Sequence, residues 1–146
     1  MRKEIEKLLQ SVQKPARYAG GELNSVMKDK NKVALRYAFC FPDTYEIGMS
    51  HLGMKILYGV ANAREDTWCE RVFAPADDME ALMRAHGEPL FALESGDPIK
   101  DFDMIGFTMQ YELSYTNILN MLDLAGVPLR AVDRKSLTPI VAFGGP

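Results

Sequence analysis

Short apolar runs alternate along the chain with segments in which apolar residues recur at helical spacing. Four runs have the aliphatic, aromatic and β-branched content of buried strands, and they cover residues 33–41, 67–73, 104–109 and 139–143. The first run is apolar on both faces, which is typical of a strand covered by helices on both sides. This alternation predicts an α/β domain with a mostly parallel sheet of about four to five strands.

The helical segments between these runs must connect parallel strands, so we expect a doubly wound sheet of the flavodoxin-like or Rossmann-like kind. The first connecting helix is predicted at residues 51–63, with Ser50 as its N-cap. Its apolar stripe is predicted to comprise Leu52, Ile56 and Val60. We expect this stripe to pack on the sheet.

Two further helices are predicted after the second and third strands. Asp77 as N-cap and Glu80 three residues later have the spacing of a variant capping box, and Gly87 marks the end of that helix. The segment 115–125 has the clearest helical period in the chain, and a C′ glycine follows it. Residues 90–93, between these two helices, are compatible with a short additional strand.

Residues 1–31 are predicted to lie outside the sheet, and residues 32–146 to form the α/β domain. An amphipathic helix is expected from residue 2 to about residue 13, followed by a segment without periodicity. Two readings of that segment stay open. It is either a connecting arm, or an extended segment that lies across another surface and contacts it through Arg17, Tyr18 and Glu22.

Composition narrows the possible partners and the cellular compartment. The 146 residues are 47% apolar and 25% charged, which is an ordinary globular balance. The net charge of −3 gives no reason to expect binding to nucleic acid or to anionic lipid. No apolar run approaches the roughly 20 residues of a membrane helix, and the charged N-terminus does not resemble a signal peptide. Cys40 and Cys69 are expected to be reduced, so we predict a cytoplasmic location.

The sequence offers no assembled catalytic or metal site. His51 and His86 are the only histidines, and neither stands at a spacing typical of metal ligands. Neither a G-x-S-x-G nucleophile elbow nor a P-loop or dinucleotide fingerprint is present. We therefore assign no catalytic residue and no metal ligand.

Three loops that follow predicted strands are the remaining candidates for a site. They comprise residues 43–49, residues 108–114 and the pair Gly144-Gly145. In a parallel sheet the carboxyl ends of the strands lie at one edge, where ligands of doubly wound proteins bind. Polar side chains beside a glycine shelf suit a large, planar, amide-fringed ligand better than a phosphate. Ordinary turns with capping residues would explain the same pattern.

Several long motifs resemble one known family. They are Lys14-Pro15-Ala16-Arg17-Tyr18 with Gly20-Gly21-Glu22-Leu23-Asn24, Phe41 to Gly53, Arg71-Val72-Phe73-Ala74-Pro75, Leu93-Glu94-Ser95-Gly96, Gly106 to Asn117, and the closing Gly-Gly-Pro. Together they resemble the N-terminal region of cobalamin-binding-type radical SAM proteins. The resemblance covers nearly the whole chain.

The resemblance implies that this chain is part of a longer protein. In that family a cobalamin-binding-like α/β domain precedes a radical SAM barrel. The barrel holds a [4Fe–4S] cluster on a C-x-x-x-C-x-x-C motif and cleaves S-adenosylmethionine. This sequence contains neither the motif nor the barrel. We therefore expect a fragment that is not catalytic alone and whose partner is the C-terminal barrel of the same chain.

Cobalamin is the cofactor that the resemblance implies for this region. The residues expected to contact it are Thr44, Tyr45, Glu46, Gly48, Thr108, Gln110, Tyr111, Gly144 and Gly145. His51 is not expected to be an axial ligand. It stands in Met-Ser-His-Leu-Gly, which departs from the D-x-H-x-x-G loop of cobalamin domains. The alternative is a domain that keeps the fold without the cofactor and serves a structural or docking role.

Overall fold

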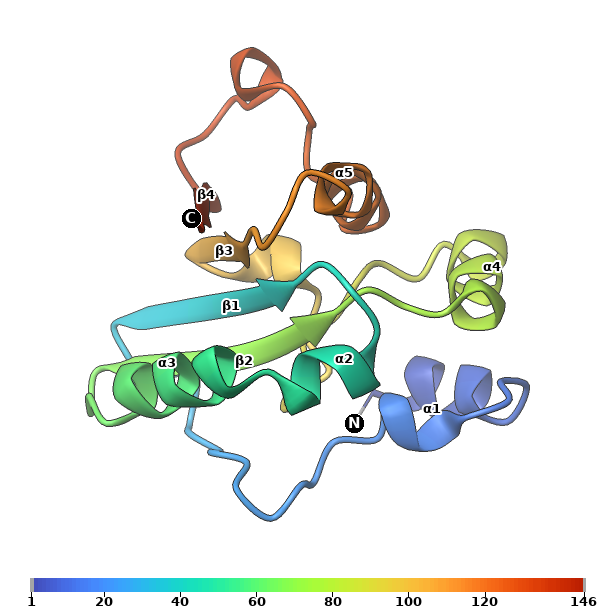
Figure 1. The fold of residues 1–146 in the computed structure, drawn as a ribbon, viewed down its shortest axis with the longest axis horizontal. Coiled ribbons are helices and arrows are strands. Elements are labelled where there is room, and N and C mark those ends of the chain that lie inside the picture. The colour runs from blue at the N-terminus through green and yellow to red at the C-terminus, as the bar shows by residue number, and fades with distance from the viewer. Residues whose placement is uncertain (1, 146) are drawn as a thin grey trace.

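The computed structural model describes residues 2–145, and its centre is a sheet of four parallel strands. The strands are β1 (Leu35–Phe41), β2 (Thr67–Phe73), β3 (Met104–Thr108) and β4 (Ile140–Gly144). They are arranged in the order β2-β1-β3-β4, so the chain reverses its direction of progress across the sheet between β1 and β3 (Figure 1). The predicted doubly wound, flavodoxin-like fold with a parallel sheet is thereby confirmed.

In the described part of the chain, five α-helices accompany the sheet. They are α1 (Lys3–Leu9), α2 (Tyr45–Ser50), α3 (Leu52–Asn62), α4 (Asp77–His86) and α5 (Ser114–Leu124). Single 3-10 turns are present at Pro15–Arg17, Ile99–Asp101 and Ala131–Asp133. The helices α3, α4 and α5 each connect two parallel strands. Helix α1 and the segment that follows it, residues 10–34, precede the sheet (Figure 1), and this segment is called the arm below.

Alternating residues of the strands separate the core into two layers. On β1, Ala38 and Cys40 face the cluster that contains α1, α4 and α5, while Phe39 and Phe41 face the cluster that contains α3. All four side chains are buried, because a parallel strand in the middle of the sheet is covered on both faces. The helix α1 shares the first layer through Ile5, so it is part of the core of the α/β domain.

The buried face of α3 differs from the predicted one. Leu52, Ile56 and Val60 are 69%, 55% and 64% exposed, whereas Met54, Tyr58 and Asn62 face the sheet. The reason is hydrogen bonding. The Asn62 amide exchanges two bonds with the backbone of Cys69, and the Tyr58 hydroxyl accepts the Val26 N–H at 2.7 Å. Periodicity could not identify this face, because both sides of the helix carry apolar residues.

The loop expected after β1 contains a short helix, α2, which ends at Ser50. The N-cap of α3 is His51 rather than Ser50, and its Nδ1 accepts the Met54 N–H at 3.2 Å. A histidine at this position takes the role that Ser or Asp usually has.

Three other local predictions need correction. Helix α1 ends at Leu9 instead of residue 13. Asp77 is the first residue of α4, not its N-cap, and Ala76 precedes it without a side-chain cap. Residues 90–93 form no strand, although Phe91 makes one isolated antiparallel bridge to Pro98. The glycine stops are confirmed, since Gly87 after α4 and Gly126, two residues after the end of α5, have φ of +65° and +70°.

The edge strand β2 is held by a buried ionic cluster. The Arg71 guanidinium contacts Glu94 at 2.6 Å and Glu22 at 2.9 Å, and it also donates to Ser25 at 2.9 Å. Burial raises the pKa of the Glu94 carboxyl, although Arg71 opposes this shift. Burial also favours a higher pKa for the Glu22 carboxyl. Its hydrogen bonds and the charge of Arg71 outweigh this effect and hold the pKa below its usual value. One side chain thus fixes both the arm and the segment after Leu93 to the sheet.

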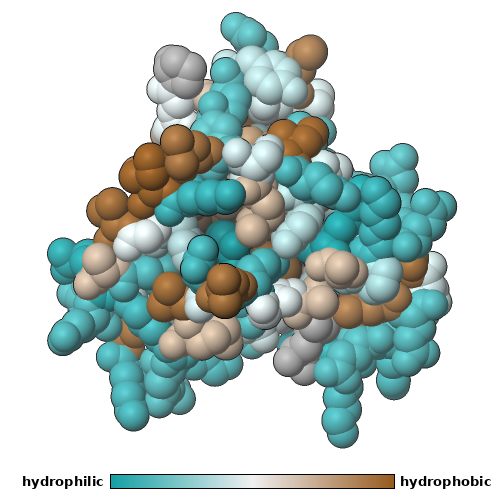
Figure 2. Space-filling model, turned by 60° about the horizontal axis from the view of Figure 1, so that its bottom comes forward, coloured by the Kyte–Doolittle hydropathy of each residue, from teal (hydrophilic) through white to brown (hydrophobic). Residues whose placement is uncertain are grey.

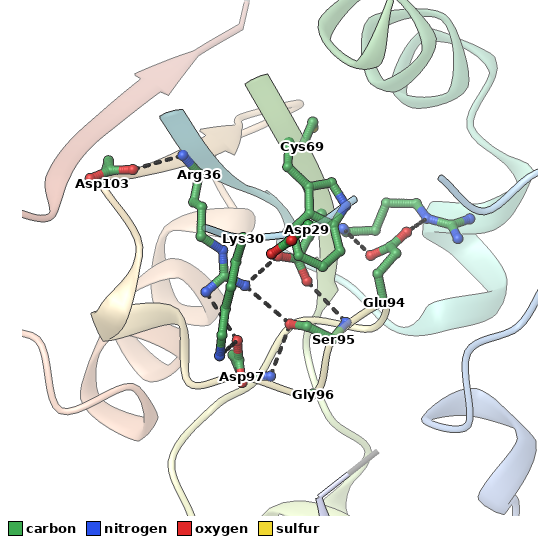
Figure 3. Close-up of polar contacts among 12 residues, drawn as sticks. Asp29, Lys30, Arg36, Cys69, Glu94, Ser95, Gly96, Asp97 and Asp103 are labelled. Carbon is green, nitrogen blue, oxygen red and sulfur yellow. Dashed lines mark hydrogen bonds and ion pairs between the residues drawn. The ribbon is translucent and has the colours of Figure 1, made fainter. Parts of the chain in front are cut away.

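A second cluster lies nearer the start of the strands. Arg36 contacts Glu70, and also Asp97 at 3.0 Å, and its guanidinium lies 4.1 Å from the ring centre of Phe102. Figure 3 shows Arg36 and Lys30 converging on Asp97 and Ser95. The two clusters together close the outer edge of β2, all of whose residues are buried.

Replacing Arg71 with methionine should destabilise the domain strongly. The variant leaves Glu94 buried without its charged partner, a change that costs about 3–5 kcal/mol in comparable buried pairs. Urea denaturation followed by circular dichroism measures the loss. Arg64→Met is the control, because the Arg64–Asp66 pair is exposed to solvent and should contribute little to stability. Equal losses in the two variants would contradict the role assigned to Arg71.

Candidate functional site

A polar cleft of about 610 Å³ lies at the carboxyl edge of the sheet. Its walls are the loop after β1, the loop after β2, the first turn of α4 and one face of α5, with the segment after α1 on the remaining side. Ligand sites commonly measure about 300–1,000 Å³, and doubly wound proteins bind ligands outside the carboxyl ends of their strands. Size and position therefore make this cleft the first candidate for a site.

The lining of the cleft is rich in carboxylates and amides. The polar and charged residues are Gln13, Lys14, Arg17, Asp43, Thr44, Asp77, Asp78, Glu80, Asn117 and Asn120. Several are held in place by neighbours: Asn117 donates to the carbonyl of Pro42 at 2.9 Å, and Asn120 donates to Glu80 at 2.8 Å. The Gln13 N–H, which donates to Asp78 at 2.8 Å, lowers the pKa of that carboxyl.

This lining can accept hydrogen bonds and can attract positive charge. The carboxylates outnumber the cations, and Arg17 is itself paired with Glu46 at 2.8 Å. The lining includes no histidine, cysteine or serine, and its one hydroxyl group is that of Thr44. The chemistry available here is recognition of a polar ligand.

The predicted residues of the β1 loop mostly contact the chain itself. Thr44 lines the cleft. Tyr45 donates its hydroxyl proton to Glu22 at 3.0 Å, and its ring packs edge-on against Phe73. The guanidinium of Arg17 lowers the pKa of Glu46, whose carboxylate it contacts. The arm thus occupies two of the side chains that we expected to be available for a ligand.

Gly48 is required for packing. A Cβ at this position would lie 2.2 Å from the ring of Phe73, so the absence of a side chain lets α2 approach β2. The backbone of Gly48 also borders a second, more apolar groove of about 410 Å³ between the arm and α3. The lining of this groove includes Met49, Met54 and Tyr58.

The loops after β3 and β4 lie beside each other at the same edge. Thr108 and Gly144 are paired in the sheet, and the Gln110 amide donates to the Thr108 hydroxyl. A Cβ on Gly145 would lie 1.9 Å from the carbonyl oxygen of Met109, so this glycine allows the two loops to touch. Open space surrounds Gly144, and Tyr111 is 51% exposed.

The parallel sheet therefore brings the strand-end loops to one edge, but the polar cleft is lined by only one of the nine predicted residues, Thr44. Sequence reasoning placed Asp43 in a candidate loop without naming it as a contact, and it missed Asn117 and Asn120 as lining residues. Asn117 could have been identified from the sequence, because it is the last residue of the Gly106–Asn117 motif. The segment after α1 contacts the rest of the domain through Arg17, Tyr18 and Glu22, as the second reading of that segment predicted, but the sequence did not indicate that it would form a wall of the cleft.

The two thiols and the His51 ring belong to the internal packing and capping of the domain. Burial raises the pKa of both thiols, Cys40 and Cys69, well above the usual value, so they stay protonated. Among residues 2–145, no group of three or more His, Cys, Asp or Glu side chains could hold a metal ion. The His51 ring serves as a helix cap and packs on Phe41.

Comparison with known families identifies the chain. The model of the family described as radical SAM proteins, N-terminal, matches residues 53–146. The chain belongs to this family. No curated protein and no solved structure matches it. Radical SAM proteins use S-adenosylmethionine and an iron–sulfur cluster, and family membership implies both for the parent protein. Across the described part of this radical SAM N-terminal region, no helix has the length and apolar character needed to cross a bilayer.

Substituting Gly48 with alanine tests whether this glycine serves packing. We expect a loss of about 1–3 kcal/mol in the free energy of unfolding, because the added methyl group overlaps Phe73. Gly59→Ala is the matched control, since no atom lies within 4 Å of a Cβ at that position of α3. It should stabilise the chain by about 0.5–1 kcal/mol. Urea denaturation measures both, and an unchanged stability of Gly48→Ala would refute the packing role.

Proposed function

We propose that this region is a docking module, which packs against the radical SAM portion of its parent protein and carries out no chemistry alone. The observation that carries the proposal is the outer face of α3. Leu52, Ile56 and Val60 are all more than half exposed there, and they share one stripe of the helix. A contiguous apolar stripe of this kind on a soluble domain marks an interaction surface.

The second groove extends this surface. Lys55 and Gly59 of α3 line the groove, and helical geometry places them directly beside the stripe. Leu23 of the arm also lines the groove and is fully exposed. Figure 2 shows apolar side chains gathered at the left of this face, where α3 runs. A ridge of apolar side chains beside a groove is the shape that partner helices and loops recognise.

Family membership supports the choice of this partner. The matched family is by its description the N-terminal part of radical SAM proteins, and α3 lies almost entirely within the matched residues. A domain joined to its partner by the chain needs only modest affinity, because the link raises the effective concentration. An exposed apolar face that contributes nothing to the core of its own domain fits such a contact.

Cobalamin binding is the second candidate function. The fold supports it, whereas the positions of several predicted contact residues speak against it. The 610 Å³ cleft and the reversal point between β1 and β3 stand where a doubly wound domain binds its cofactor. Against this, Tyr45 and Glu46 are engaged by the arm, Gly48 is covered by Phe73, and Gly145 touches the Met109 backbone. These four of the nine residues predicted to contact the corrin therefore serve contacts within the chain.

The docking proposal predicts the effect of Ile56→Glu in the parent protein. Glutamate keeps the helix propensity but places a charge in the apolar stripe, so the affinity of the docked pieces should fall at least about tenfold. After proteolytic cleavage between the two regions, co-migration in gel filtration and calorimetry measure this affinity.

Leu113→Glu is the control for that experiment. Leu113 is 78% exposed and lies outside α3, so its substitution should leave the affinity unchanged. Equal affinities of Ile56→Glu and the unsubstituted protein would remove the α3 face from the proposal. Pieces that separate even without substitution would reject docking altogether.

Titration with hydroxocobalamin separates the two candidates. A docking module should leave the visible spectrum of the cofactor unchanged and should lose it in gel filtration. A spectral shift together with retained cofactor would instead establish the second candidate. Circular dichroism of the same sample ensures that the result comes from folded protein.

A further inference from the structure

We propose that the groove between the arm and α3 binds a small, uncharged ligand that has an apolar body and one carbonyl oxygen. This inference goes beyond the docking function, because Leu52, Ile56 and Val60 of the exposed stripe do not line the groove. It also concerns a different place from the polar cleft. Within residues 2–145, no residue lines both cavities.

The groove has the size and the apolar character of a ligand site. Its volume is about 410 Å³, and ligand pockets commonly measure about 300–1,000 Å³. The side chains of Met54 and Tyr58, which line it from α3, are buried, and Met49 of α2 also lines it. Methionine side chains are flexible and pack well on aromatic rings, so this lining suits a ligand with an aromatic or aliphatic body.

The arm, which forms the opposite wall, is held in place by hydrogen bonds. The Val26 N–H donates to the Tyr58 hydroxyl at 2.7 Å, and the Val26 carbonyl accepts the Trp68 indole N–H at 2.9 Å. Farther along the arm, the Lys28 ammonium group donates to the carbonyl of Thr67 at 2.6 Å. Because both walls are fixed by the fold, a ligand does not have to order them when it binds.

One donor at the groove lacks a strong acceptor. The Arg71 side chain lines the groove and is only 8% exposed. Its Nε donates to Glu94, and its Nη2 donates to Glu22 and Ser25. Within the described residues, the acceptor for Nη1 is the Met49 sulfur at 3.2 Å, and a thioether is a weak acceptor. A ligand oxygen in place of the sulfur would form a charge-assisted hydrogen bond.

The charges around this donor favour an uncharged ligand. The carboxylates of Glu22 and Glu94 balance the positive charges of Arg71 and of the exposed Lys55, which also lines the groove. A carboxylate or phosphate on the ligand would lie beside two carboxylates that already neutralise Arg71. A ketone or amide carbonyl accepts the hydrogen bond of Nη1 without adding charge.

Gly59 allows the groove to be blocked in folded protein. This residue of α3 lines the groove, and no atom lies within 4 Å of a Cβ at its position. A large side chain there meets no packed atom of the domain, so it can occupy the space that the ligand would use. Gly59→Phe is therefore expected to remove the site and to preserve the fold.

Titration of the 146-residue chain with prodan tests the proposal. Prodan is a neutral naphthalene that carries one ketone, and its fluorescence shifts to shorter wavelength in apolar surroundings. We expect saturable binding of one prodan per chain, with an affinity at least about tenfold lower in Gly59→Phe, where the new ring clashes with the probe. Ile56→Glu should bind prodan normally, because Ile56 lies outside the groove.

Substitutions of Met49 test the hydrogen bond to Arg71. Met49→Gln supplies an amide oxygen to Nη1, so prodan has to compete for this donor and should bind at least about tenfold more weakly. Met49→Leu removes the sulfur and keeps an apolar wall, so the affinity should be unchanged or higher. An analogue with a methylene group in place of the ketone should bind more weakly than prodan to the unsubstituted chain, and equally well to Met49→Gln.

The outcomes separate this inference from the docking function. Absence of saturable prodan binding by protein that circular dichroism shows to be folded would overturn it. Binding that is lost in Ile56→Glu and retained in Gly59→Phe would assign the probe to the stripe and would also overturn it. Tighter binding of the anionic probe anilinonaphthalene sulfonate would refute the uncharged class. Docking is measured on the cleaved pieces, so none of these results decides it.

If Gly59→Phe disturbs folding, the Met49 variants and the ketone-free analogue still decide the matter. An analogue that binds the unsubstituted chain as tightly as prodan does would show that Nη1 takes no part, and would overturn the proposal.

Discussion

The ion pairs of Arg71 are the interaction on which the arrangement of this domain depends. A guanidinium on an edge strand is normally solvated, but here it is buried between Glu94, Glu22 and the ring of Tyr58. Charges removed from water are tolerated only when their partners are in place, so the arm and the segment after Leu93 must both be seated for the cluster to form. The edge of β2, the position of the arm and the surroundings of Tyr45 follow from this one requirement.

Local patterns in the sequence predicted the strands, whereas features that depend on contacts between distant residues could not be predicted. Strand positions and the parallel sheet follow from local patterns, and the four runs of apolar residues were placed within two residues of the observed strands. The inward face of α3 could not be read in this way. Tyr58 and Asn62 face inward because they bond to Val26 and Cys69, and these partners are distant in sequence or belong to another element. Apolar periodicity carries no information about such bonds.

For the candidate site too, the location could be predicted from the sequence, but the contacts of its side chains could not. Topology alone brings the loops after β1, β3 and β4 to one edge, so the location of a site was predictable from the alternation of elements. The availability of its side chains was not. Glu22 and Arg17, which occupy Tyr45 and Glu46, belong to an arm whose path has no periodic signature. The cleft that remains is lined largely by residues that motif reasoning had treated as structural.

The unequal edges of the sheet have a consequence for biogenesis. The arm, β1, β2 and residues 93–97 are all synthesised before β4, so the closed edge can be completed while the ribosome is still extending the chain. Within the described residues the opposite edge is β4, where Ile140 and Phe143 are each 54% exposed, and β4 follows all of these elements in the chain. The covered edge at β2 can therefore form before the uncovered edge at β4 is synthesised. This order limits the time during which unpaired backbone groups are exposed to other molecules.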